Sequence, residues 1–204
     1  MTGAFFLTGC ETNSPKSGSA AAASASPVGD AGVPLHKDKD IQGVWLAPGF
    51  KFTGYDALFV APTEYAGVVR DNEIKERALT ITGVQAAIVS AAQATGVFPK
   101  VVAGAPDSAG KNLSLTNTII KFEKGGGAAR YWAGLYGAGQ PHVRVRGKMF
   151  DGVKLVCVYE VERSGEGGGA RMFGGFKSDN SILSNDIRDL ASDLAEFFKR
   201  TSLK

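Results

Sequence analysis

The sequence predicts a two-layer α/β sandwich of the α+β class, with two helices packed on a mixed, mostly antiparallel sheet of about five strands. A disordered N-terminal tether precedes this domain. Strand-like and helix-like segments follow one another in the order strand, helix, several strands, helix. Apolar residues make up 44% of the 204 residues, which is enough material for one hydrophobic core.

The first ten residues predict a site of lipid attachment. Leu7-Thr8-Gly9-Cys10 fits the lipobox of bacterial lipoproteins, in which small residues precede a cysteine that is acylated and becomes the mature N-terminus. Two or three acyl chains give durable membrane anchoring where a single chain does not. No Lys or Arg precedes Cys10, and the apolar stretch covers only residues 4–7. We therefore expect residues 1–10 to be a partial signal peptide, or the natural start codon to lie upstream. A chance cysteine in a disordered start is the alternative.

Residues 11–38 are rich in Ala, Ser, Gly and Pro and cannot bury enough apolar area to offset the entropy of ordering. We expect a flexible tether, with a root-mean-square span of about 30 Å if it behaves as a coil. Residues 39–204 then form a single globular domain. In Gram-negative bacteria an Asp after the acylated cysteine commonly marks inner-membrane retention. Glu11 at that position favours the outer membrane, with the domain facing the periplasm.

The first half of the domain predicts two strands around a helix. Residues 56–61 form a short apolar run ended by a proline, which is typical of a buried strand. Apolar positions recur at helical spacing from 71 to 95, where Asp71 or Asn72 can cap the start and Gly96 can end the helix. Residues 97–102 contain Pro99, which predicts an edge strand. No run of 18 consecutive apolar residues occurs, which argues against a membrane-spanning helix.

The second half predicts further strands and a closing helix. Residues 113–123 are strand-like, and residues 142–149 and 153–161 predict a β-hairpin. We expect a three-residue loop at 150–152, with Gly152 left-handed at a bulge, because this register sorts polar and apolar residues onto separate faces. It places Val145 opposite Cys157, Val143 opposite Tyr159 and His142 opposite Glu160.

The last helix is predicted to run from a cap at Ser184 to Lys199-Arg200, with acidic residues in its first turn and basic residues in its last. Its apolar stripe could bind a partner, but docking on its own sheet is the favoured interpretation. The stripe consists of Ile187, Leu190, Ala191, Leu194, Phe197 and Phe198.

A glycine-rich segment carries a family resemblance. Residues 122–130 read Phe-Glu-Lys-Gly-Gly-Gly-Ala-Ala-Arg and precede a second Gly-rich turn, the hairpin and the terminal amphipathic helix. Together with the lipobox, this pattern resembles the bacterial lipoproteins of the domain of unknown function 4410 family, over roughly residues 55–200. The resemblance implies a small α/β envelope domain and carries no established enzymatic activity.

The residues that common catalytic and metal sites require are few. The two histidines, His36 and His142, lie far apart in the sequence, so we expect no zinc site and no Cys–His pair. If Cys10 is acylated, Cys157 remains alone, and its apolar neighbours predict a buried core residue. Residues 104–112 resemble a phosphate-binding loop, but the spacing is one residue too long and Asn112 stands where Ser or Thr is needed. We expect no enzymatic activity, no cofactor and no metal.

Two features remain as candidate binding sites. The first is a repeated Gly-Gly-Gly pattern followed by arginine, at Gly125, Gly126, Gly127 with Arg130 and at 167–169 with Arg171. Backbone amides of such a loop can bind an anion, although close passage of the loop over the sheet is the favoured explanation. Beside the first loop, Tyr131, Trp132 and Tyr136 could form an aromatic partner surface with Arg130, or else cover the core.

The second feature is a basic strand. Residues 121–177 contain ten Lys or Arg and five Asp or Glu, and Arg144, Arg146 and Lys148 share one strand face. This face could bind lipopolysaccharide, phospholipid headgroups or a glycan. Pairing with nearby residues such as Glu160 and Glu162 is the default interpretation. Nucleic acid is not expected as a partner.

From the sequence we therefore predict a non-catalytic lipoprotein that is anchored in the membrane through Cys10 and binds another envelope protein. A binding module for an anionic envelope ligand is the alternative.

Overall fold

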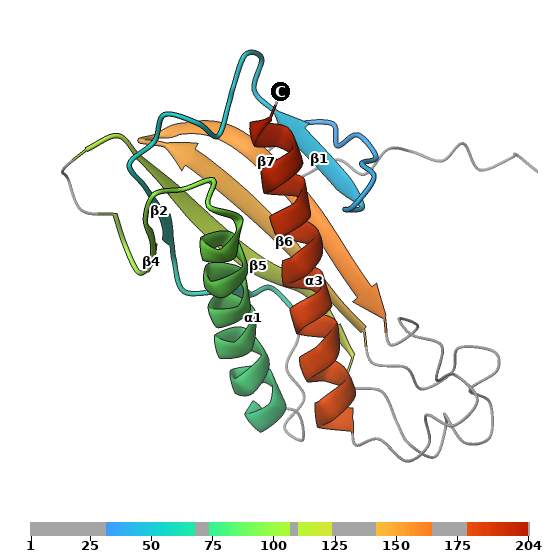
Figure 1. The fold of residues 1–204 in the computed structure, drawn as a ribbon. Helices are drawn as coiled ribbons and strands as arrows, with labels where there is room; N and C mark the ends of the chain where they lie inside the picture. The colour runs from blue at the N-terminus through green and yellow to red at the C-terminus, as the bar shows by residue number, and fades with distance from the viewer. Residues whose placement is uncertain (1–31, 68–73, 107–109, 124–141, 165–178, 204) are drawn as a thin grey trace, which may run out of the picture.

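The computed structural model describes residues 32–67, 74–106, 110–123, 142–164 and 179–203. These residues form seven strands and two helices (Figure 1). In chain order they are β1 Gly43–Leu46, β2 Ala57–Val60, β3 Glu64–Tyr65, α1 Ile74–Thr95, β4 Val101–Ala103, β5 Asn112–Glu123, β6 His142–Asp151, β7 Lys154–Ser164 and α3 Asp179–Ser202.

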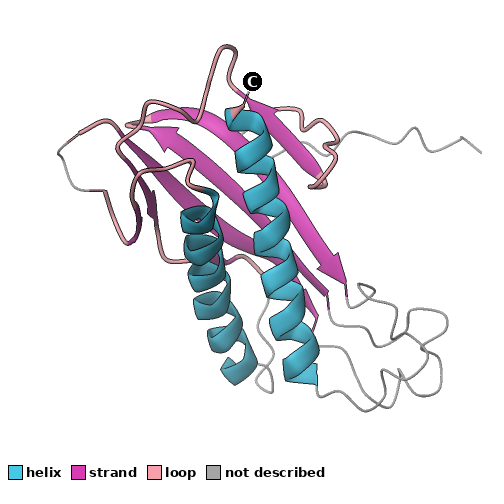
Figure 2. Ribbon diagram, in the orientation of Figure 1, coloured by secondary structure: helices cyan, strands magenta, loops and turns pink. Residues whose placement is uncertain are grey.

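One mixed sheet runs in the order β1-β7-β6-β5-β2-β4, with β3 also paired to β5. The pairs β1–β7, β5–β6 and β6–β7 are antiparallel, and the pairs that involve β2, β3 and β4 are parallel. Both helices lie over the same face of the sheet (Figure 2). The two-layer architecture with a mixed sheet agrees with the prediction, but the strand count is seven rather than about five. The two strands that the sequence missed, β1 and β3, have only four and two residues, too few to show a periodicity.

The chain joins the domain earlier than expected. The boundary was predicted at residue 39, yet Leu35 is 2% exposed, and His36 exchanges two backbone hydrogen bonds with Val44 of β1, of 2.8 and 2.9 Å. Arg200 near the end of α3 binds Asp38 at 2.5 Å and Asp40 at 3.1 Å. These contacts fix the segment that follows the predicted tether to the C-terminal end of α3.

The helix boundaries agree with the sequence signals at one end and differ at the other. Gly96 has a φ of +66° and follows the last residue of α1, as expected of a C-terminal glycine. The predicted caps Asp71 and Asn72 lie outside the described residues. In contrast, α3 begins at Asp179, so Ser184 lies inside the helix and is not its cap. Residues 179–181 are Asp-Asn-Ser, three further capping types, and the sequence alone could not rank them.

The predicted register of the hairpin is wrong. The turn is Gly152-Val153, and Val145 pairs with Val161 rather than with Cys157. Gly152 has the expected positive φ, +58°, but the bulge lies between Met149 and Phe150. His142 likewise faces Ser164 rather than Glu160, and Val143 faces Arg163 rather than Tyr159. The observed register also separates most polar from apolar residues, but it places Val143 opposite Arg163 and Lys148 opposite Val158, so the polarity rule alone did not select it.

The core lies between the sheet and the helices. Every residue of the predicted α3 stripe is buried, which confirms that this face docks on the sheet. Phe198 meets Phe52 from the β1–β2 loop and Phe98 from the α1–β4 loop, with ring centroids 5.2 and 5.7 Å apart in edge-to-face geometry. The aromatic cluster thus ties two loops to the end of α3.

Gly147 in β6 is required by the packing of its neighbour. Tyr159 of β7 lies directly across Gly147 and donates a hydrogen bond of 2.5 Å from its hydroxyl to Oδ1 of Asn117 in β5. All three residues lie in the interior, and a Cβ at position 147 would overlap the Tyr159 ring. The glycine therefore lets one side chain bridge three strands.

We predict that Gly147→Ala lowers the free energy of unfolding by about 3 kcal/mol, because the Tyr159 ring has to leave its place. Gly83→Ala on α1 is the matched control. A Cβ there would lie 3.6 Å from Cδ1 of Ile187, an ordinary contact, and should raise stability by about 1 kcal/mol. Urea unfolding of both variants checks the prediction, and equal effects would contradict it.

Candidate functional site

Several predicted site residues lie outside the described residues. These are Cys10, Gly125, Gly126, Gly127, Arg130, Tyr131, Trp132, Tyr136 and Arg171. Among the candidates, the structure places Arg144, Arg146 and Lys148, all on β6. Their side chains alternate along the strand with Val143, Val145 and Met149, which belong to the core. The basic residues therefore point away from the helices.

Carboxylates of β7 meet the basic residues of β6. Arg146 pairs with Glu160 through both Nε and Nη2, and the Nε contact measures 2.8 Å. Arg144 donates from Nε to Glu162 at 2.5 Å, and His142 contacts the other oxygen of the same carboxylate. Opposite charges across neighbouring strands account for these pairs, because Arg146 faces Glu160 and Arg144 faces Glu162 in the ladder.

Burial decides how strong these pairs are. The side chain of Glu160 is 3% exposed and that of Arg146 is 12% exposed, so neither charge is free to bind a ligand without leaving the other unpaired in the interior. Burial alone would raise the pKa of Glu162, but hydrogen bonds from Arg144 and His142 outweigh it and lower that pKa. The pairing favoured from sequence is therefore present, and it leaves Arg144 and Arg146 poorly suited to an anionic ligand.

Cys157 is a core residue, as the sequence predicted. The side chain is fully buried beneath the helices, and burial strongly raises the pKa of the thiol. A thiol with a raised pKa is a poor nucleophile. Among the described residues, no three His, Cys, Asp or Glu side chains are grouped so that they could hold a metal ion.

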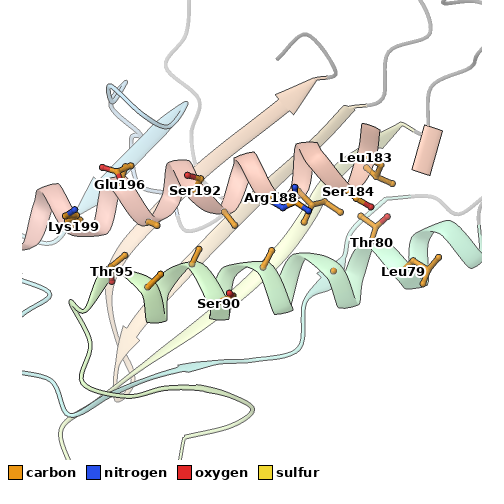
Figure 3. Close-up of a pocket in the computed structure, with 17 residues that line it drawn as sticks. Leu79, Thr80, Ser90, Thr95, Leu183, Ser184, Arg188, Ser192, Glu196 and Lys199 are labelled. Atoms are coloured by element: carbon orange, nitrogen blue, oxygen red, sulfur yellow. The ribbon is translucent and has the colours of Figure 1, made fainter. Parts of the chain in front are cut away.

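The sequence analysis missed a groove between α1 and α3. This groove has a volume of about 670 Å³ and lies on the side of the helix layer that faces away from the sheet (Figure 3). Its floor consists of buried and half-buried residues, and its rim of exposed ones, among them Leu79 and Ser90 of α1 and Arg188, Ser192 and Glu196 of α3. Small side chains on both helices leave the space open, since Gly83, Ala87, Ala91, Ala191 and Ala195 all line it.

Between residues 78 and 95 the exposed face of α1 carries no charge. From Ala78 to Thr95 the helix has no Asp, Glu, Lys or Arg, and only 22% of these residues are buried. Leu79 is 69% exposed. By length and composition this stretch could cross a membrane, although its apolar residues do not form an unbroken run. In the structure it packs beside α3 and over β2 and β4. The other exposed residues on it are Ala78, Thr82, Ala86, Ser90, Gln93 and Ala94.

A sequence signal for this face exists. Eighteen successive residues without charge are unusual in a chain with 21% charged residues, and a solvent-facing helix normally carries charge on its outer side. Apolar spacing identifies the buried positions of a helix and carries no information about which residue types are missing from its opposite side.

A buried carboxyl group lies where α3 meets β7. Asp186 is 5% exposed, and its Oδ2 has no hydrogen-bond partner among the described residues. Burial and the nearby Asp189 raise its pKa to about 6, against the opposing effect of Arg163 and His142. Arg163 forms its ion pair with Asp193, which follows Asp186 on α3 by seven residues, or about two helical turns.

We predict that Arg146→Met lowers the free energy of unfolding by about 3 kcal/mol, because it leaves the Glu160 carboxylate buried and unpaired. Lys121→Met is the control, since Lys121 and its partner Glu123 are 44% and 55% exposed and their pair should contribute less than about 1 kcal/mol. Chemical unfolding at pH 7 measures both. Equal small losses would show that the buried pair does not stabilise the fold.

We predict that Asp186→Asn stabilises the protein at pH 8 by about 2 kcal/mol and has little effect below pH 4. The folded protein holds the Asp186 proton up to about pH 6, whereas an unfolded chain releases it near pH 3.9. Wild-type stability therefore falls as the pH rises through this window, and the amide variant avoids that loss. Thermal unfolding across pH 4–8 tests this, with the exposed Glu64→Gln as control; a constant difference between wild type and variant would contradict it.

Comparisons with known proteins place the chain in a family. The model of the domain of unknown function DUF4410 matches residues 63–184. No curated protein matches the sequence significantly.

Solved structures with a similar arrangement share little sequence with this chain. The PelC dodecamer from Paraburkholderia phytofirmans is 14% identical, with 74% of this chain and 95% of that chain covered and a TM-score of 0.45. Protein XCC0632 from Xanthomonas campestris, of family DUF330, is 12% identical, with 78% and 91% covered and a TM-score of 0.44. The hypothetical protein CT253 from Chlamydia trachomatis is 8% identical, with 72% and 98% covered and a TM-score of 0.41. The match over more than half of the sequence shows that the chain belongs to the DUF4410 family, as the glycine-rich segment and hairpin had suggested.

Proposed function

We propose that this protein is a non-catalytic envelope lipoprotein, anchored through Cys10 and facing the periplasm, that acts by binding another protein. The lipobox and the Ala/Ser-rich segment that follows it support the anchor, and Glu11 supports the outer membrane. The observation that carries the binding role is the uncharged outer face of α1 together with the groove beside it.

An uncharged, solvent-facing helix is costly for a protein that remains alone. Contiguous apolar patches on soluble domains mark interaction sites, and depletion of charge is the compositional signature of an interface core. Here the uncharged residues of α1 border a groove whose floor is apolar and whose far rim, on α3, is polar. An apolar centre with a polar rim is the usual organisation of a protein-binding surface.

The attachment of the N-terminal segment leaves this surface accessible. Asp38 and Asp40 hold the segment at the C-terminal end of α3 through Arg200, so an anchored chain enters the domain at one end of the helix layer. The groove begins near that end, at Lys199, and runs along both helices to Leu79 and Leu183 (Figure 3). A partner in the periplasm could therefore approach it from the side.

Binding of an anionic envelope ligand to the basic strand has less support. Arg144 and Arg146 already have carboxylate partners on β7, and a ligand would have to compete with them. We therefore place the binding role on the helix face.

Membrane fractionation and crosslinking test this proposal in cells that produce the protein from its natural start codon. We expect acylated Cys10 by mass spectrometry, and we expect Cys10→Ala to move the protein to the soluble fraction. We further expect Ala86→Arg to abolish crosslinks to envelope proteins, because it places a charge at the centre of the uncharged face.

Val153→Arg is the matched control for crosslinking, since Val153 is fully exposed in the turn between β6 and β7 and does not line the groove. An unmodified, soluble wild-type protein would overturn the anchor. Crosslinks that survive Ala86→Arg would overturn the binding face.

A further inference from the structure

We propose that the partner of the helix face is a second copy of this chain, packed antiparallel on it about a two-fold axis. The axis crosses α1 at the level of Ile88 and α3 at the level of Ser192. This inference rests on the proposed binding role of the face and names its occupant. It is carried by one pair of opposite charges on α3 and by two pairs of uncharged positions on α1 that the same axis relates.

The two helices lie side by side and run in the same direction, which fixes which residues are level. Gly83 of α1 meets Ile187 of α3, so positions 104 apart in the sequence lie at the same height. Leu79, Thr80 and Leu183 lie toward one end of the groove, and Thr95, Glu196 and Lys199 lie toward the other, so the two helices run in the same direction (Figure 3). Ile88 is therefore level with Ser192.

The exposed charges of α3 are complementary to themselves about this level. Arg188 and Glu196 lie four residues to either side of Ser192, and all three are exposed on the groove rim. They are about 12 Å apart along the helix, too far to pair with each other. Among the described residues neither has an ion-pair partner; Arg188 only contacts Asn185 at 3.4 Å. An antiparallel second α3 that crosses at Ser192 brings Arg188 of each copy beside Glu196 of the other.

The same axis makes the α1 faces complementary. Ala86 and Ser90 lie two residues to either side of Ile88, and Thr82 and Ala94 lie six residues to either side. The two-fold operation therefore places Ala86 opposite Ser90 and Thr82 opposite Ala94. All four are exposed, small and uncharged, so two antiparallel α1 helices can approach closely without burying a charge.

A two-fold contact of this kind is isologous, so one surface meets itself and no further copies are added. The exposed face of α1 would be covered in both copies, with the two grooves facing each other across the contact, which accounts for the lack of charge on α1. The two α3–α3 ion pairs at the edge set the antiparallel orientation.

Sedimentation of the purified full-length chain, made as Cys10→Ala to omit the lipid, tests this inference. We expect twice the monomer mass at about 100 µM, a concentration at which micromolar affinity would be visible. Arg188→Glu places two carboxylates together at both symmetric contacts, and Glu196→Arg places two guanidinium groups together there. Each single variant should weaken self-association by about a hundredfold or more.

A mixture of the two single variants tests whether residue 188 of one copy contacts residue 196 of the other. In a heterodimer of Arg188→Glu with Glu196→Arg, both contacts again join opposite charges, so the mixture should recover the dimer that each variant alone loses. The double variant R188E/E196R should also recover it. Lys154→Glu, an exposed charge reversal next to the hairpin turn, should leave self-association unchanged.

A monomer at every concentration would overturn the inference, as would an assembly larger than a dimer or a mixture that fails to recover self-association. If the purified chain stays monomeric while Ala86→Arg still abolishes envelope crosslinks, the second copy is excluded and the proposed binding role stands. If the dimer forms as described and the crosslinks to other proteins survive Ala86→Arg, the self-association stands and the binding of another protein through this face is overturned.

Discussion

The pairing of β6 with β7 is the constraint on which the rest of the fold depends. Two adjacent ladder pairs fix its register from opposite faces. On the outer face the buried Glu160 needs Arg146, and on the inner face Tyr159 needs the space above Gly147. A slip of one residue would place Arg146 and Tyr159 on the same face, so either the arginine would point into the core or the tyrosine would be exposed. The helices then pack on the inner face that this register defines, with α3 over β6 and β7.

The two helices differ in the charge that their solvent-facing sides carry. In α3 an apolar stripe docks on the sheet, and the opposite side carries Arg188, Glu196 and Lys199. In α1 the buried positions are as well packed, with Val84 and Ile88 in the core, but the outer side has no charge between residues 78 and 95. The domain thus has one helix suited to water and one suited to a protein interface, and the groove lies between them.

The sequence predicted what depends on local patterns. The apolar stripe of α3, the end of α1 at Gly96 and the buried Cys157 each follow from composition over a few residues. The hairpin register did not, because several alignments separate polar from apolar residues and the choice between them depends on long-range partners, here Glu160 with Arg146 and Tyr159 with Asn117. The groove was missed for a similar reason. It forms only because two helices that are far apart in the sequence lie side by side, and no single segment of the sequence predicts this arrangement.

The placement of charges indicates which surface of the domain is available to bind a partner. The basic strand is prominent in the sequence, but Arg146 neutralises the buried Glu160 and Arg144 neutralises the half-buried Glu162, so these arginines stabilise the fold. On α1 the reverse holds. Ala86 is exposed, and Lys, Glu or Gln there would cost the helix little in propensity while improving solubility. Folding gives no reason to leave seven exposed positions of one helix uncharged. The proposed contact supplies such a reason, because an uncharged face is an advantage only when it is covered.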